Sequence, residues 1–242
     1  MADTVRIFAA THVGYVRRSN EDRIRAPDWQ TRGDDGDWIA TAGRDGMWML
    51  VADGMGGHGA GEVASEIAVH TLARRLAEAT GPAGIIDAIA EANDAVHLAM
   101  TTGVGRPAMG TTIVGALLRG QVCTFFNVGD SRAYVLRGSD LTRHSVDHTP
   151  AGGRAVAMRS HALTQSLGGT LSRRRLEPHV EEFELAPGDI VMLCSDGLTD
   201  LVVEAGIASI LRNATEHPAA ALVAAALEAG GRDNVSVAVL AI

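Results

Sequence analysis

The sequence is poor in cysteine: only Cys123 and Cys194 occur among 242 residues, each inside an apolar run. A secreted disulfide framework or a zinc site needs more cysteines or a different spacing, so both kinds of site are excluded. We therefore expect two buried thiols in a reducing compartment.

Long apolar runs and an excess of positive charge are also missing. No run reaches the roughly 18 apolar residues that a membrane span needs. The first ten residues, "MADTVRIFAA", lack the basic start and apolar stretch of a signal peptide. A net charge of −8 gives no hint of nucleic-acid binding, which usually shows as a basic face. We expect a cytoplasmic protein whose partners include neither a membrane nor nucleic acid.

The apolar content is sufficient for a large core. At 46% hydrophobic residues and with no linker, residues 1–242 are predicted to form a single domain. Apolar runs bounded by turn residues predict strands, which are 111–118, 122–129, 132–137, 189–195 and 235–242. The first three are too close together for crossover helices, so we expect them to form an antiparallel meander.

Helical periodicity predicts an antiparallel helix pair over 62–78 and 84–102, and a third helix over 218–230. The segments 25–46 and 145–162 are predicted to be loops. Clustered helices and runs of strands favour an α+β fold, in which helices cover antiparallel sheets, over repeated βαβ units.

The stretch "VADGMGGHGAGEVAS" (51–65) contains a G-x-G-x-x-G formed by Gly54, Gly56 and Gly59. A dinucleotide site needs a strand, this turn, a helix and then a second strand. Two successive helices follow here, and Asp53 would face a pyrophosphate with its negative charge. A nucleotide-binding oxidoreductase is therefore the weaker hypothesis.

Aspartates at the ends of apolar runs offer a different chemistry. Asp53-Gly54 and Asp196-Gly197 each end such a run, where a strand would hold the carboxylate rigidly. Acidic residues at comparable junctions are Glu21, Asp22, Asp130 and Asp233. Hard cations such as Mg²⁺ and Mn²⁺ prefer oxygen ligands, and two such ions can clamp a phosphoryl transfer.

Seven motifs occur along the chain in a familiar order: "VRRSNED", "VADGMGGHGAGEVAS", "MGTTIVGALL", "NVGDSRAYVLR", "LTQSLGG", "CSDGLTD" and "GRDNVSVAVL". Together they resemble bacterial metal-dependent protein phosphatases of type 2C. The resemblance implies a four-layer α-β-β-α sandwich of two mainly antiparallel sheets flanked by helices. It also implies hydrolysis of phosphoserine and phosphothreonine with two core Mn²⁺ or Mg²⁺ ions.

The resemblance carries roles residue by residue. Asp53 would bridge the two metals, the Gly54 carbonyl and Glu21 would bind one, and Asp196 and Asp233 would hold the other. Asp22 would accept a hydrogen bond from metal-bound water, and Asp130 would take part with Asp196 in a third, weaker metal site.

In the mechanism that the resemblance implies, a metal-bridging hydroxide attacks phosphorus directly. Arg17, four residues before Glu21, matches the phosphate-binding arginine, with Arg18 as its neighbouring alternative. Eukaryotic relatives carry a histidine where this chain has Met55. His58 is the candidate general acid, and a solvent-facing histidine or a metal-bound water are the alternatives.

Neither cysteine heads a C-x₅-R motif, because Gly129 and Asp200 occupy the sixth positions, so a thiol nucleophile is excluded. The segment between "DHT" (147–149) and "LTQSLGG" (163–169) is shorter than the flap typical of the family, which leaves the third metal open. The expected partners are phosphorylated proteins and a cognate Ser/Thr kinase, and the expected state is a monomer. A metal-binding pseudophosphatase that acts as a signalling scaffold is the alternative.

Overall fold

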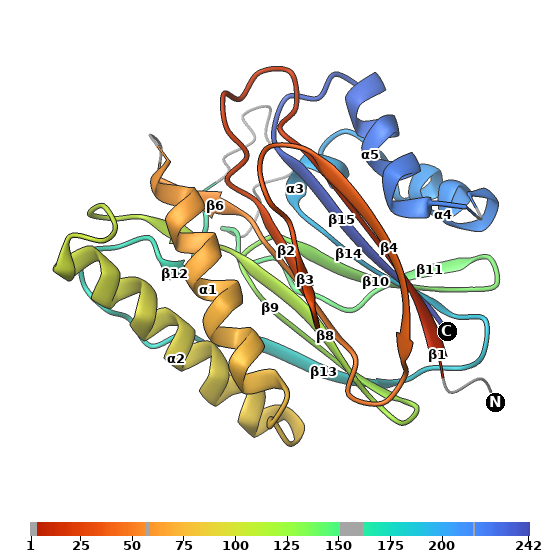
Figure 1. The fold of residues 1–242 in the computed structure, drawn as a ribbon, viewed down its shortest axis with the longest axis horizontal. Helices are drawn as coiled ribbons and strands as arrows, with labels where there is room; N and C mark the ends of the chain where they lie inside the picture. The colour runs from red at the N-terminus through yellow and green to blue at the C-terminus, as the bar shows by residue number, and fades with distance from the viewer. Residues whose placement is uncertain (1–3, 57–58, 151–161, 215) are drawn as a thin grey trace.

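Two six-stranded antiparallel sheets lie face to face and are covered by helices on both outer sides (Figure 1). The structure is a computed structural model and describes residues 4–56, 59–150, 162–214 and 216–242. The layers therefore follow the order helices, sheet, sheet, helices. This order confirms the predicted α-β-β-α sandwich.

One sheet joins the two ends of the chain, because β1 and β15 are neighbours in it. Its order is β11 (Asp140–Arg143), β10 (Arg132–Arg137), β14 (Ile190–Cys194), β15 (Val235–Ala241), β1 (Thr4–His12) and β4 (Gly36–Gly43).

The facing sheet has the order β13 (His179–Glu184), β9 (Val122–Val128), β8 (Ile113–Arg119), β5 (Trp48–Ala52), β2 (Arg23–Ala26) and β3 (Trp29–Gln30). A small third sheet has the order β12 (Leu167–Gly168), β7 (Gly110–Thr111) and β6 (Gly54–Met55). Because β6 follows β5 directly, this small sheet continues the chain away from Asp53.

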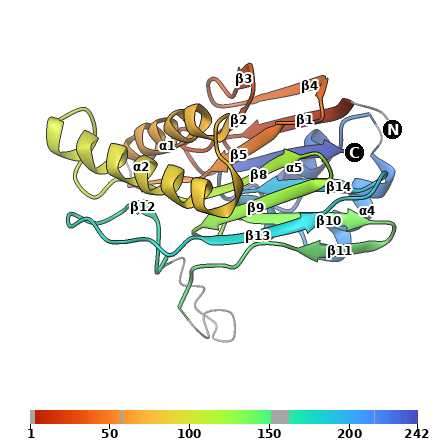
Figure 2. The same ribbon diagram turned by 90° about the horizontal axis from the view of Figure 1, so that it is seen from below.

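The expected helix pair is present: α1 (Ala60–Leu76) packs beside α2 (Gly81–Thr102) on the β8–β9 side of the molecule (Figures 1 and 2). The third expected helix is α5 (Pro218–Glu228), followed by two glycines with positive φ. The sequence patterns missed α4 (Glu204–Asn213) and the short α3 (Asp196–Thr199), which lie with α5 on the outer side of the other sheet.

Three apolar cores hold the four layers together. The first includes Leu72 of α1 and Ile89 of α2, packed on the β5–β8–β9 face. The second fills the space between the two sheets and includes Phe125. The third lies under α4 and α5 and includes Phe8. The central strands β8, β9, β10, β14 and β15 are buried on both faces and read as continuous apolar runs, which is why these five were recognisable in the sequence.

Two expectations about strands were wrong. The segment 25–46 is not a loop, because it forms the hairpin β2–β3 and the edge strand β4. In β4 only alternate residues face the core, so its apolar run is interrupted by polar and small residues. Second, β10 does not continue a meander from β8 and β9 but pairs with β11 and β14 in the opposite sheet.

The glycine-rich turn has no βαβ context. After β5 and β6 the chain forms α1 and α2 in succession and then returns in β8, which is antiparallel to β5. This order contradicts the dinucleotide-binding hypothesis. Within the described ranges, no helix is long and apolar enough to cross a membrane.

Candidate active site

The predicted acidic residues meet at one end of the sandwich, where β5, β9 and β14 end and β15 begins. A cavity of about 280 Å³ opens there. Its wall is formed by Arg17, Glu21, Asp53, Gly54, Met55, Gly56, Thr112, Asp130, Leu163, Asp196, Asp233 and Asn234. A larger cavity of about 690 Å³ beside β3 and α1 mixes arginine, histidine and carboxylate side chains. Volume alone therefore does not mark the site.

The carboxylates in this cavity raise one another's pKa. Burial raises the pKa of Asp53 well above its ordinary value, and the negative charge of Asp22 adds to the rise. Burial, followed by the charge of Asp233, raises the pKa of Asp196 to about 6. Burial and the charge of Asp196 raise the pKa of Asp130 to about 7. A site that concentrates uncompensated negative charge favours a bound cation.

Gly54 and Gly61 allow the backbone at Asp53 to approach α1 closely. A Cβ on Gly54 would lie 2.3 Å from the carbonyl oxygen of Gly61. A Cβ on Gly61 would lie 2.6 Å from the Glu21 Oε2 atom. Two residues without side chains thus bring three segments into contact: the turn after β5, the start of α1 and the loop that carries Glu21.

Asp22 is buried beneath this cavity, and its surroundings hold one of its two oxygens. Its Oδ2 accepts a hydrogen bond of 2.8 Å from the Ser195 hydroxyl. Its Oδ1 is buried and has no hydrogen-bond partner among the described residues. Burial raises the pKa of Asp22 to about 6. Such an acceptor requires a donor, and a water molecule in the adjacent site would supply one.

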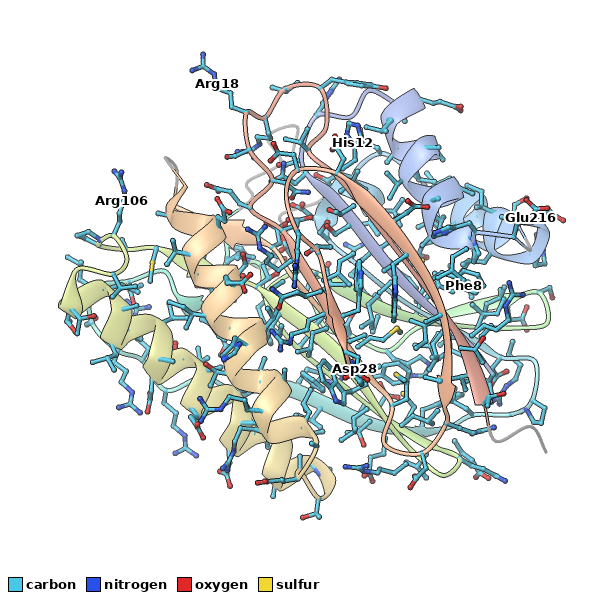
Figure 3. All side chains as sticks on the ribbon, viewed as in Figure 1. Phe8, His12, Arg18, Asp28, Arg106 and Glu216 are labelled. Atoms are coloured by element: carbon cyan, nitrogen blue, oxygen red, sulfur yellow. The ribbon has the colours of Figure 1, made fainter. Side chains whose placement is uncertain are left out.

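Arg17 lies over the cavity and contacts one of the predicted metal ligands. Its guanidinium donates a hydrogen bond of 2.6 Å to Asp233 Oδ2, and its side chain is 54% exposed. That contact raises the pKa of Arg17. The alternative arginine, Arg18, points away from the molecule into solvent (Figure 3). Of the two, Arg17 is the one that lines the cavity.

Asn234 is a residue that the sequence patterns missed. Its side-chain amide donates hydrogen bonds of 2.8 and 3.1 Å to the carbonyls of Val13 and Ser19, and its Oδ1 accepts one of 2.8 Å from the Glu21 amide. These three bonds join the start of β15 to the loop that carries Arg17. The only signal in the sequence is a polar residue directly after Asp233, before an apolar run.

The same loop is anchored from α1. The Arg23 guanidinium donates to the carbonyls of Asn20 and Asp22, and it forms a 2.6 Å ion pair with Glu62. The Ser65 hydroxyl donates a 2.6 Å hydrogen bond to the Glu21 carbonyl. Glu21 and Asp22 are therefore held by β15 on one side and by α1 on the other.

The donor set fits hard divalent cations, because it consists of carboxylates and backbone carbonyls. As they stand, no three histidine, cysteine or acidic side chains of the described ranges are arranged to hold an ion. Asp233 is bonded to Arg17, so binding a cation there requires this carboxylate to change partners.

Other sequence expectations have mixed outcomes. Cys123 and Cys194 are buried free thiols, and burial raises the pKa of both. Thr112 was not anticipated, yet its hydroxyl accepts a 3.1 Å hydrogen bond from the Asp53 amide. His58 and residues 151–161 of the flap lie outside the described residues, so the predicted general acid stays a prediction.

The family whose sequence model matches this chain, over residues 29–229, is described as protein phosphatase 2C. The chain belongs to the protein phosphatase 2C family. Membership confirms the resemblance that was drawn from the sequence motifs.

Two relatives and one solved structure show what this phosphatase 2C chain is similar to. Serine/threonine protein phosphatase PstP of Mycobacterium tuberculosis is 31% identical over 246 residues, which cover 97% of this chain. Serine/threonine phosphatase stp of Listeria monocytogenes is 32% identical over 209 residues, 78% of this chain and 82% of stp. The crystal structure of the PstP catalytic domain with two manganese ions has a TM-score of 0.80 at 31% identity, covering 98% of both chains.

The phosphatase 2C chain is shorter than the first of these relatives, since it spans 44% of the length of M. tuberculosis PstP. This chain and the PstP catalytic domain have the same fold along almost their whole lengths, because the structural alignment covers 98% of each. The manganese ions belong to that PstP structure.

Proposed function

We propose that residues 1–242 act as one protein phosphatase domain that hydrolyses phosphoserine and phosphothreonine in proteins with Mn²⁺ or Mg²⁺. One observation carries the proposal: in a phosphatase 2C chain, Asp53, Asp196, Asp233 and Glu21 converge from four separate segments on one cavity with an arginine over it. We further propose that the domain opposes a Ser/Thr kinase in the cytoplasm.

The metal ligands would be Asp53 between two ions, Glu21 and the Gly54 carbonyl on one, and Asp196 and Asp233 on the other. Asp130, with a pKa raised to about 7, would contribute to a third, weaker site together with Asp196. When bound, such ions supply Lewis acidity and lower the pKa of water for an in-line attack on phosphorus. Support comes from the shared donor chemistry and from the two manganese ions in the PstP structure.

Arg17 would bind the phosphoryl oxygens of the substrate. Its planar guanidinium can donate two parallel hydrogen bonds to a phosphate, and its exposure leaves room for a substrate. In this role Arg17 exchanges Asp233 for phosphate, and Asp233 becomes free to act as a ligand. The buried Oδ1 of Asp22 would accept a hydrogen bond from a water molecule and so orient it.

The test is hydrolysis of a phosphothreonine peptide with and without Mn²⁺. Wild-type protein should turn the peptide over only with metal. Asp53→Ala and Asp196→Ala should each reduce kcat/KM at least a hundredfold, as expected when a pre-organised charge is removed from a site. Asp140→Ala, at an exposed acidic residue of β11, is the matched control and should behave as wild type.

Two results would contradict the proposal. Turnover that is independent of metal would remove the proposed ligand roles. Binding of Mn²⁺ and of phosphopeptide without any turnover would instead identify a pseudophosphatase that works as a scaffold.

A further inference from the structure

Three consecutive arginines stand out in the segment that joins β12 to β13. Residues 171–176, "LSRRRL", contain Arg173, Arg174 and Arg175, all exposed, in a chain where acidic residues outnumber Lys and Arg by 29 to 21. We call these six residues the arginine segment. Leu171 at its start is 79% exposed.

The positive charge of the arginine segment is only partly neutralised. Arg173 donates a 2.6 Å hydrogen bond to Asp94 of α2. Arg174 and Arg175 form no ion pair with any described residue, although Glu177 follows two positions later. Two guanidinium groups are thus left for a ligand from outside the chain.

The backbone beneath these arginines is held in place. The side chain of Asn93 in α2 accepts a 2.9 Å hydrogen bond at Oδ1 from the Gly168 backbone amide, and its Nδ2 donates one of 3.5 Å to the Arg174 carbonyl. At the far end, Gln165 accepts a 2.7 Å hydrogen bond from the Glu177 amide and donates one of 3.3 Å to its carbonyl. A fixed backbone lowers the entropic cost of binding because only the side chains must be ordered.

The chain passes the wall of the catalytic cavity two residues before the arginine segment begins. Met55 lines that cavity, and its Cε lies 3.1 Å from the Cβ position of Gly169. Arg174 follows Gly169 by five residues, so its Cα lies at most about 18 Å away. From there the segment runs along the side of α2 (Figure 2). An extended substrate whose phosphate is in the cavity could reach Arg174 with a residue up to about eight positions away.

Without bound cations the cavity repels acidic segments, because five of its lining residues are carboxylates, and the chain as a whole carries a net charge of −8. A basic surface next to such a cavity attracts and orients acidic segments, and its effect is felt mostly in association and at low salt. We propose that the arginine segment is a docking surface for a cluster of acidic residues in the phosphoprotein substrate, several positions from the phosphorylated residue. This inference rests on the proposed phosphatase function.

The test compares two phosphothreonine peptides of the same length, one with three glutamates five to eight residues from the phosphothreonine and one with glutamines there. Wild-type protein with Mn²⁺ should show a kcat/KM for the glutamate peptide about threefold to tenfold higher at low ionic strength, and the preference should vanish at high salt. The Arg174→Glu/Arg175→Glu variant should lose this preference but hydrolyse a small aryl phosphate at the wild-type rate.

The matched control is Arg32→Glu/Arg74→Glu, which makes the same change in net charge at two exposed arginines outside the arginine segment. This control should retain the preference for the glutamate peptide. If it also loses the preference, net charge rather than the arginine segment is responsible and the proposal is overturned.

Two further readouts separate the possible failures. Aryl phosphate turnover without a glutamate preference overturns the docking surface and leaves the phosphatase function standing. If no substrate is turned over, the phosphatase function fails, and fluorescence anisotropy of the two labelled peptides still tests docking. Equal affinity for both peptides, or binding to RNA that the Arg174→Glu/Arg175→Glu variant loses, would overturn docking of an acidic protein segment.

Discussion

Replacing Gly61 by alanine tests whether the contact between the Asp53 turn and α1 positions the site. The new Cβ would lie 2.6 Å from Glu21 Oε2 and 2.5 Å from the Gly54 carbonyl carbon, whereas ordinary contacts begin at 3.4 Å. The distances to both groups must therefore grow, by about 0.8 Å for Glu21 Oε2 and about 0.9 Å for the Gly54 carbonyl carbon. A displacement of about 1 Å in a catalytic site can reduce its rate about a hundredfold.

The stability change has two opposing parts. Alanine is favoured over glycine inside a helix by about 1 kcal/mol. Overpacking a rigid contact costs about 1–3 kcal/mol. The expected net change for Gly61→Ala is therefore a loss of up to about 2 kcal/mol in the free energy of unfolding, together with a tenfold to hundredfold lower kcat/KM.

Gly84→Ala is the matched control, because it makes the same substitution in the first turn of α2. There the added Cβ would lie 3.4 Å from its nearest neighbour, an ordinary contact. We expect this variant to gain up to about 1 kcal/mol in stability and to keep wild-type activity. Thermal unfolding without metal and Mn²⁺-dependent peptide hydrolysis measure the two effects separately. Wild-type kcat/KM in Gly61→Ala would refute the proposed role of this contact.

Three other predictions concern the charged site and its support. Asp53→Asn removes a carboxylate that is buried among other carboxylates, so it should raise the metal-free free energy of unfolding by about 0.5–2 kcal/mol. It should also abolish the rise in Tm that Mn²⁺ causes. A metal-free Tm below that of the wild type would count against this prediction. The folded metal-free protein holds extra protons on Asp130 and Asp196, whose pKa values are raised from 3.8 to about 7 and about 6. The contribution of Asp130 and Asp196 to the stability of the metal-free protein should therefore fall as pH rises from about 4 to about 7. In thermal melts, the Asp130→Asn/Asp196→Asn variant should show a weaker dependence of stability on pH. Asn234→Ala removes three hydrogen bonds, so it should lower the free energy of unfolding by about 2–4 kcal/mol and weaken Mn²⁺ binding measured by calorimetry. The control Leu72→Ala should lower the free energy of unfolding by about 2–5 kcal/mol through a core cavity and leave the Mn²⁺ affinity unchanged.

The helix pair α1–α2 and most central strands could be predicted because their signals are local. A repeat of apolar residues every three to four positions identifies a helix, and an apolar run between turn residues identifies a strand buried on both faces. The edge strand β4 escaped prediction because only alternate residues face the core. The placement of β10 in the opposite sheet also escaped, since strand pairing depends on contacts distant in sequence.

The candidate site, like the fold, has features that the sequence predicts and features that depend on tertiary contacts. Asp53, Asp196 and Asp233 could be proposed from the sequence alone, because each stands where an apolar run meets a turn. Their gathering around one cavity of about 280 Å³ depends on the pairing of β14 with β15 and on the packing of the two sheets against each other.

The sequence by itself determined the kinds of residue available for chemistry: oxygen ligands in short motifs and an arginine four residues before Glu21. Only the tertiary structure decided which of them are close together. It bonded Arg17 to Asp233, held Glu21 through Asn234, and left Asp22 Oδ1 buried without a partner among the described residues. The reason is physical: a motif specifies side chains along the chain, whereas burial, pKa and hydrogen bonding depend on neighbours that folding brings together from distant segments.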